Sequence, residues 1–219
     1  MEKAWTGAFR LLGGDRQVAA AAAADLAARY AQPHRRYHGS AHARAVVRDS
    51  AVLARELGLP AAERAVLTIA AAAHDVVYDG HPGDDERRSA SWARDWLTRA
   101  GVPRAHVARA GELILATMTH QAPSQDLTAW ALLDADLAIL GADREAYDRY
   151  RAAVREEYGA VDEPAWRAGR AAVMTRLLAR DPLYGTGAAR QRWETAARAN
   201  IARELQSLTA ARLTDGPLN

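Results

Sequence analysis

The sequence predicts an all-α protein, and three observations support this class. Alanine dominates the 219 residues, and β-branched and aromatic residues are not concentrated in any segment, which favours helices over strands. No segment alternates apolar and polar residues for long enough to form a strand. Glycine and proline interrupt the chain at helix-sized intervals. We therefore expect one all-α domain over residues 1–219.

The expected helices lie between these interruptions. The breaks are Gly13-Gly14, Pro33, Gly58 with Pro60, Gly80 to Gly83, Gly101 to Pro103, Pro123, Gly159 and Gly185 to Gly187. In chain order, the helices are predicted at 3–12, 15–31, 41–58, 61–77, 84–101, 103–120, 126–140, 143–158, 163–180 and 188–212. The chemical motifs fall within about 30–141, and the helices of 143–212 are expected to pack on that part.

Two of these helices, 61–77 and 126–140, are the most apolar. The run Ala65–Ala73 is almost uninterrupted, so other helices are expected to surround it. The same helix ends in His74-Asp75, which places two polar groups at the edge of the core. Such groups are costly there unless they have partners. A metal ion is one suitable partner.

Charge and composition exclude several classes of function. The net charge is only +2, and Lys3 is the sole lysine beside 28 arginines that are dispersed among carboxylates. We therefore expect no nucleic-acid polymer as a partner. The absence of cysteine excludes disulfides and thiolate chemistry. The apolar run Val18–Ala24 is too short for a membrane span, so we expect no membrane partner and a cytoplasmic location. The oligomeric state is left open.

Histidine and aspartate occur in a pattern that suits a metal. In Tyr37-His38-Gly39-Ser40-Ala41-His42 two histidines stand four residues apart, so we expect them on one face of a helix, one turn apart. His74-Asp75 adds a second imidazole and a carboxylate, and Leu133-Asp134-Ala135-Asp136-Leu137 follows later. Imidazole and carboxylate together are ligands for a divalent transition metal. The order is H…HD…D.

This order, in an all-helical chain, resembles the HD superfamily of metal-dependent phosphohydrolases. Within it the chain looks most like the bacterial proteins described as predicted metal-dependent HD phosphohydrolases. The matching residues are Tyr30, Pro33, Arg36-Tyr37-His38, His42, His74-Asp75, Tyr78-Asp79, Glu86, Ser89-Ala90, Thr117, His120, Asp134-Ala135-Asp136-Leu137 and Gly141, with a weaker match at Arg151, Glu156-Glu157-Tyr158, Arg170, Tyr184 and Asn200. The resemblance covers about residues 25–205 and implies an HD-domain helical bundle.

The segment from Tyr37 to Ala43 is also distantly similar to cyclic-nucleotide phosphodiesterase cores. That similarity implies that His38 is a general acid and His42 a metal ligand. By the same resemblance His74 is the second ligand, and Asp75 is a catalytic carboxylate and ligand that can bridge two metals. The chain lacks the aromatic-rich purine clamp of those diesterases, so their cyclic-nucleotide specificity is not carried over.

The remaining candidates surround this set. Asp134 and Asp136 lie about 200° apart on a helix, so they cannot face the same point. We expect Asp136, at the family's ligand position, to bind metal and Asp134 to contact substrate or support the ligands; the choice between them stays open. Substrate-contacting or supporting roles are also expected for Arg36, Glu86 and His120. Arg36 would receive phosphate oxygens in bidentate fashion.

The resemblance implies a metal-dependent phosphohydrolase that cleaves a phosphate ester, as a monoesterase or a diesterase. The substrate is expected to be a nucleotide or another small phosphorylated metabolite. The cofactor is expected to be one or two divalent cations, of Mn, Co, Ni, Mg, Fe or Zn. Two alternatives stay open: an HD-type di-iron oxygenase, and a non-catalytic protein that binds a nucleotide through its metal.

Overall fold

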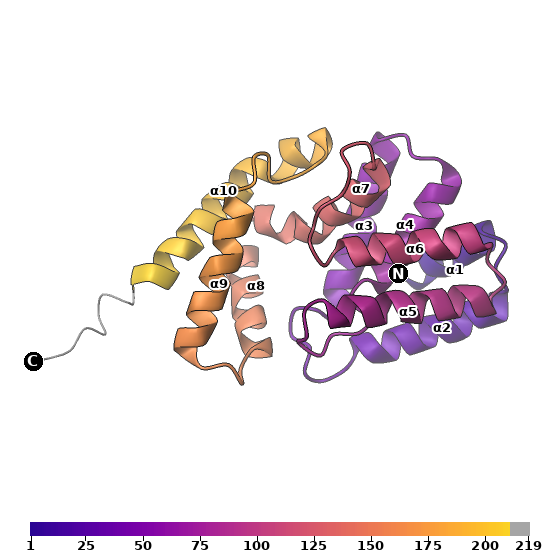
Figure 1. The fold of residues 1–219 in the computed structure, drawn as a ribbon, viewed down its shortest axis with the longest axis horizontal. Coiled ribbons are helices and arrows are strands. Elements are labelled where there is room, and N and C mark those ends of the chain that lie inside the picture. Colours follow the sequence, from indigo (N-terminus) through magenta and orange to yellow (C-terminus); the bar gives the residue numbers. More distant parts are fainter. Residues whose placement is uncertain (211–219) are drawn as a thin grey trace, which may run out of the picture. The chain divides into compact units, whose positions relative to one another are not determined.

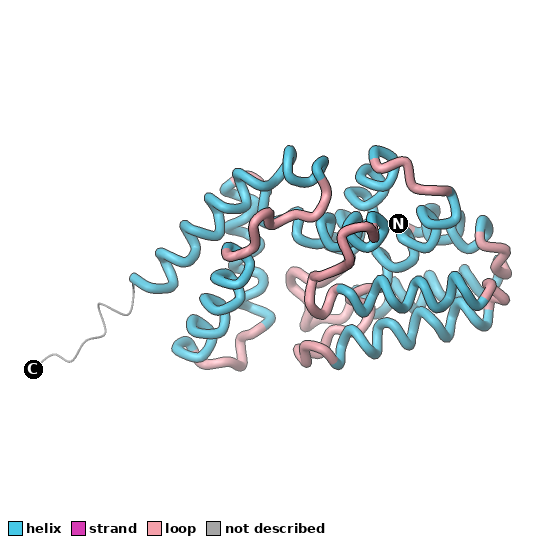
Figure 2. Tube along the Cα trace, turned by 45° about the horizontal axis from the view of Figure 1, so that its top comes forward, coloured by secondary structure: helices cyan, strands magenta, loops and turns pink. Residues whose placement is uncertain are grey.

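A computed structural model of the chain describes residues 1–210, which form ten α-helices, one short 3₁₀ helix and no strand (Figure 1). The helices are α1 (Glu2–Leu11), α2 (Arg16–Tyr30), α3 (Ser40–Glu56), α4 (Ala61–Ala73), α5 (Asp84–Arg99), α6 (Arg104–Ala116), α7 (Leu127–Asp136), η1 (Leu137–Gly141), α8 (Arg144–Glu157), α9 (Glu163–Leu178) and α10 (Gly187–Ala210). The predicted all-α class is confirmed. Figure 2 shows that the connections between the helices are loops.

Three α-helices end four residues before the predicted position. The helix expected at 61–77 ends at Ala73, and the helix expected at 103–120 ends at Ala116. The apolar pattern continues past both ends, whereas the chain turns there. The helix expected at 126–140 is α only as far as Asp136 and then tightens into η1. Residues 211 and 212 of the predicted helix 188–212 lie outside the described residues.

Contacts within the chain group it into two compact units, Met1–Asp136 and the part that begins at Leu137. The single domain expected from the sequence stays a prediction.

The first unit is built around α4. This helix contacts α1, α3, α5, α6 and α7, and the four alanines Ala70–Ala73 of its last turn are completely buried. Small side chains allow the neighbouring helices to approach its backbone closely. The prediction that this apolar helix is surrounded by others is confirmed. The C-terminal end of α4 therefore lies in the interior of the unit.

In the second unit, η1 packs against α8 and α10, and α9 packs against α10. The buried Arg170 guanidinium donates to the Glu204 carboxylate over 2.9 Å, and the Tyr147 hydroxyl donates to the same carboxylate over 2.5 Å. A buried charge of this kind is tolerated because it is paired and hydrogen-bonded. These hydrogen bonds satisfy the buried polar groups within the second unit.

Gly141 ends η1 where α10 crosses it. A Cβ atom at this position would lie 2.5 Å from Trp193 Cβ and 2.8 Å from the Trp193 carbonyl oxygen. Asn200 holds the contact by donating to the carbonyls of Leu140 and Ala142, each over 2.9 Å. No side chain larger than hydrogen fits at residue 141 without moving one of the two helices.

We expect Gly141→Ala to lower the free energy of unfolding by about 1–3 kcal/mol, because an overpacked contact forces the backbone to shift. Urea denaturation measures the change. Gly169→Ala is the matched control: it lies in α9 with nothing within 4 Å of the added Cβ. There alanine should be neutral or stabilise by about 0.5–1 kcal/mol. Equal effects of the two substitutions would contradict the close contact.

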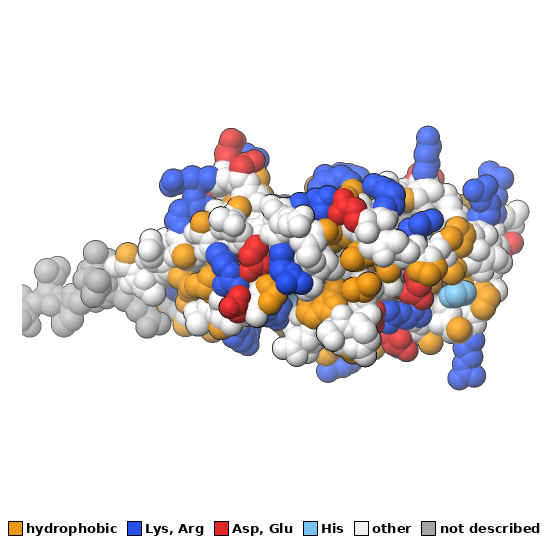
Figure 3. All heavy atoms as spheres, turned by 90° about the horizontal axis from the view of Figure 1, so that it is seen from above, with side chains coloured by type: hydrophobic (Ala, Val, Ile, Leu, Met, Phe, Trp, Pro, Cys, Tyr) orange, Lys and Arg blue, Asp and Glu red, His pale blue; other side chains and the backbone are white. Residues whose placement is uncertain are grey.

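The surface carries charges of both signs. On the face drawn in Figure 3, Lys and Arg side chains are interspersed with those of Asp and Glu. Among residues 1–210, no helix combines the length and the apolar character that crossing a bilayer requires.

Candidate metal centre

Three helix ends in the first unit deliver histidine and aspartate to one place. His42 lies in the first turn of α3, His74 caps the C-terminus of α4 with Asp75 directly after it, and Asp136 is the last residue of α7. The helices α3, α4 and α7 contact one another pairwise. Segments more than thirty residues apart in the chain therefore meet at their ends.

The ligand atoms of this group are close together. His42 Nε2 lies 3.1 Å from His74 Nε2 and 3.1 Å from Asp136 Oδ1, and His74 Nε2 lies 3.3 Å from the same oxygen. These three residues form a group whose ligand atoms all lie within 4.8 Å of one another. Asp75 Oδ2 also approaches the two imidazole nitrogens, at 3.4 Å from His42 and 3.1 Å from His74.

These distances fit one divalent cation. Atoms that bind an ion at about 2.1 Å lie about 3.0 Å apart at adjacent octahedral positions and about 3.4 Å apart at tetrahedral ones. His74 Nδ1 donates to the Ala71 carbonyl over 3.0 Å, which leaves Nε2 as the ring nitrogen that faces the group. A metal-binding histidine characteristically donates its other ring N–H to a carbonyl in this way. The described residues thus contain a His/Asp group able to hold a metal ion, of an identity that the group itself does not specify.

The electrostatics of the group favour a cation. Burial opposes ionisation of Asp136 and Asp75, but the neighbouring imidazoles outweigh it and hold the pKa of both carboxyls below the ordinary range. Burial likewise lowers the pKa of His74, and the two carboxylates overcome it, so that this pKa lies well above its usual value. The pKa of His42 is raised for the same reason. Without a metal, protons provide the positive charge that the two carboxylates require.

His120 approaches the group from the opposite side of Asp136. Its Nε2 lies 3.0 Å from Asp136 Oδ2, whereas the other oxygen of that carboxylate faces His42 and His74. His120 follows α6 in a left-handed backbone conformation, with φ +50°, and its N–H donates to the Ala116 carbonyl. Such a conformation is uncommon outside glycine and occurs more often at functional sites. The expectation that His120 lies at the site agrees with this placement.

His38 lies at the site but not on the helix. The expectation that His38 and His42 share a helix face was wrong, because Gly39 is the extended N-cap residue and α3 begins only at Ser40. Their rings are nevertheless 5.6 Å apart, centroid to centroid. The His38 ring stacks on Tyr78 at 4.1 Å with an interplanar angle of 22°. It is partly exposed, unlike the buried His42 and His74.

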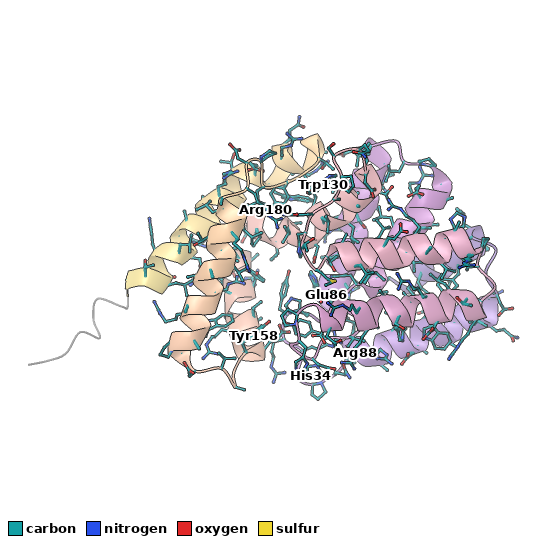
Figure 4. The ribbon with its side chains drawn as sticks, viewed as in Figure 1. His34, Glu86, Arg88, Trp130, Tyr158 and Arg180 are labelled. Carbon is teal, nitrogen blue, oxygen red and sulfur yellow. The ribbon has the colours of Figure 1, made fainter. Side chains whose placement is uncertain are left out.

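Three other candidates are placed differently. Asp134 is buried within α7, while Asp136 is the one in the metal-sized group. Arg36 is exposed and donates to the Pro33 carbonyl over 2.9 Å. Glu86, visible at the start of α5 in Figure 4, accepts from the Gly83 N–H over 2.6 Å, as acidic residues of a first turn commonly do. Substrate-related roles for these three stay predictions.

Two residues of the site were given no role from the sequence. Arg35 is buried and donates to the carbonyls of His38, Asp75 and Val76. Tyr30 is buried, and its hydroxyl lies beside Asp75. Burial, and then the charge of Asp75, raise the pKa of the Tyr30 hydroxyl well above its usual value, so it remains protonated. Arg35 is one of 28 arginines, and nothing in the sequence distinguishes it from the others. Tyr30 is the last residue of α2, so the packing of that helix brings its side chain to the site.

Comparison with family models, with curated proteins and with solved structures finds no match to this chain.

Proposed function

We propose that this protein is an HD-type, metal-dependent phosphohydrolase that cleaves a phosphate ester. One observation carries the proposal: the imidazoles of His42 and His74, with the Asp136 carboxylate, place their ligand atoms within 4.8 Å of one another inside the first unit. The order of these residues in the chain is the H…HD…D order of the superfamily that the sequence resembles. The geometry supports a metal, and the resemblance supports the reaction.

The ligands would be His42, His74, Asp75 and Asp136. A divalent ion in this group would supply an activated water near neutral pH and positive charge for the phosphoryl oxygens. Hydrogen bonds orient the site: the Ala71 carbonyl holds His74, and His120 holds the outer oxygen of Asp136. Fixing the donors in advance reduces the reorganisation that the transition state requires.

His38 is suited to the proton transfer. It is partly exposed beside the buried group, where a substrate can reach it. A well-placed imidazole N–H can pass its proton to the oxygen of the departing group, as a general acid does. Because the inner imidazoles are committed to the metal, His38 is the histidine best placed for this step.

The proposed substrate is a nucleotide or another small phosphorylated metabolite. This part rests on the resemblance to the superfamily, because a fold class alone does not specify a substrate. Ester cleavage without a catalyst is extremely slow, so even modest activity on a small ester is measurable above background.

The test is phosphate release by the purified protein from a panel of nucleotides and small phosphate esters, with Mn, Co, Mg or Ni supplied separately. We expect turnover with at least one metal. Asp75→Ala should reduce it to background, because it removes a carboxylate 3.1 Å from His74 Nε2. Circular dichroism should show that this variant stays folded.

Asp95→Ala is the matched control, since this carboxylate is exposed on α5 and should be dispensable. A panel on which the wild type never exceeds Asp75→Ala would refute the hydrolase. Metal analysis tests the alternatives: two tightly bound irons with oxygen uptake would indicate an oxygenase. Tight nucleotide binding without product would indicate a binding protein.

A further inference from the structure

Arg35 joins the two segments that carry the candidate acid and the candidate ligands. Its Nη1 donates to the His38 carbonyl over 2.9 Å and to the Asp75 carbonyl over 2.6 Å, and its Nη2 donates to the Val76 carbonyl over 3.0 Å. Only 7% of the residue is exposed. One guanidinium thus ties the loop before α3 to the turn after α4.

The same guanidinium also lies against the aromatic ring that supports His38. Its Cζ is 5.2 Å from the Tyr30 ring centroid and 5.8 Å from that of Tyr78. Tyr78 in turn stacks on the His38 ring. Arg35 therefore restrains His38 twice, through its main chain and through the tyrosine behind its imidazole.

We propose that Arg35 is a positioning residue that holds the His38 imidazole in place beside the His42–His74–Asp136 group. This inference rests on the proposed function. In the hydrolysis, the oxygen of water loses a proton to the solvent and forms a bond to phosphorus, as the bond from phosphorus to the leaving oxygen breaks. His38 passes its proton to that leaving oxygen and becomes neutral. The transfer requires the imidazole within hydrogen-bond reach of the leaving oxygen, so loss of its support weakens this step selectively.

Arginine suits this task because its planar fork presents five N–H donors in fixed directions. Three carbonyls from two segments accept from it at once. A lysine ammonium has the charge but not the planar array. The role is distinct from that predicted for Arg36, which is exposed and whose guanidinium donates to the carbonyl of Pro33.

The test compares two esters that differ in their need for an acid. Phenyl phosphate has a poor leaving group that benefits from protonation. The leaving group of p-nitrophenyl phosphate, p-nitrophenolate, departs readily without a proton. General acid catalysis contributes about 10²–10⁴-fold. We expect Arg35→Ala to lower kcat on phenyl phosphate by about 10–100-fold, and on p-nitrophenyl phosphate by less than about 3-fold. The double variant with His38→Ala should be no slower than His38→Ala alone.

Three further measurements separate positioning from general damage. The stoichiometry of bound Co²⁺ should be unchanged in Arg35→Ala, since Arg35 offers no ligand atom. Arg48→Ala, which removes an exposed arginine bonded to Asp49, should leave both esters unaffected. Should Arg35→Ala not fold, Arg35→Lys must show the same selective loss to a smaller degree.

Equal losses on the two esters, loss of the bound cobalt, or an additive double variant would overturn the role of Arg35 while leaving the hydrolase standing. Absence of any turnover by the wild type would instead overturn the proposed function, and the inference with it.

Discussion

Asp136→Asn should abolish the stabilisation that a divalent metal gives the protein. In the wild type, Mn²⁺ at 100 times its dissociation constant should raise the free energy of unfolding by about 2.7 kcal/mol, because it binds only the folded state. For a chain of this length that corresponds to a rise in Tm of about 5–10 °C. Asparagine keeps the shape of Asp136 but removes the charge that faces both histidines.

Thermal unfolding with and without the metal measures this effect. Asp134→Asn is the comparison, because it makes the same chemical change two residues away in the same helix. It should retain the metal-induced rise in Tm. If Asp134→Asn loses the rise and Asp136→Asn keeps it, the ligand assignment made from the geometry is wrong. Loss in neither variant would place the ion elsewhere.

Metal affinity should increase steeply with pH. The pKa of His74 is raised well above its usual value by Asp75 and Asp136, and that of His42 is raised as well, so both imidazoles keep their protons to a higher pH than a free imidazole does. A metal must displace these protons before it binds. Each displaced proton makes the apparent affinity change by about tenfold per pH unit below the histidine pKa. Between pH 6 and 8 the dissociation constant should therefore fall by at least an order of magnitude.

The stability of the metal-free protein should change in the opposite direction. A histidine whose folded pKa is raised contributes stability that is complete below its unfolded pKa of about 6.5. This contribution is lost as pH rises through the folded pKa. The lowered pKa values of Asp75 and Asp136 add stability above about pH 4 that disappears on acidification. Metal-free stability should accordingly be highest between about pH 4 and 6.5.

Isothermal titration calorimetry across this range, in buffers of different ionisation enthalpy, would count the protons released on binding. Urea denaturation of the metal-free protein would give its own pH profile. Affinity that does not vary with pH would mean that the imidazoles are already neutral, contrary to the charge balance of the group.

The sequence predicted the parts of this molecule that depend on local pattern. The apolar run of α4 indicated a surrounded helix, and His74-Asp75 at its end indicated a polar group in need of a partner; both describe the structure. The metal-sized group of His42, His74 and Asp136 also joins residues named from the sequence. Helix spacing limited the choice at α7 to one aspartate, and the structure brings Asp136 to the histidines.

What the sequence could not predict depends on tertiary contact. Gly39 is extended and α3 begins only after it, so His38 lies outside the helix. The spacing of four residues therefore did not predict the position of His38. Arg35 and Arg36 are adjacent and chemically identical, yet one is buried among carbonyls and the other is exposed. Only the packing of distant segments distinguishes them.

The alanines that end α4 also constrain how this centre can vary. Ala70–Ala73 are completely buried, with the close-packed backbone of the helix leading directly to His74. Because an added methyl group in a fully buried turn must push against its neighbours, we expect it to displace the imidazole. In a library of random variants selected for metal retention, these chemically inert positions should therefore tolerate substitution as poorly as the donors themselves.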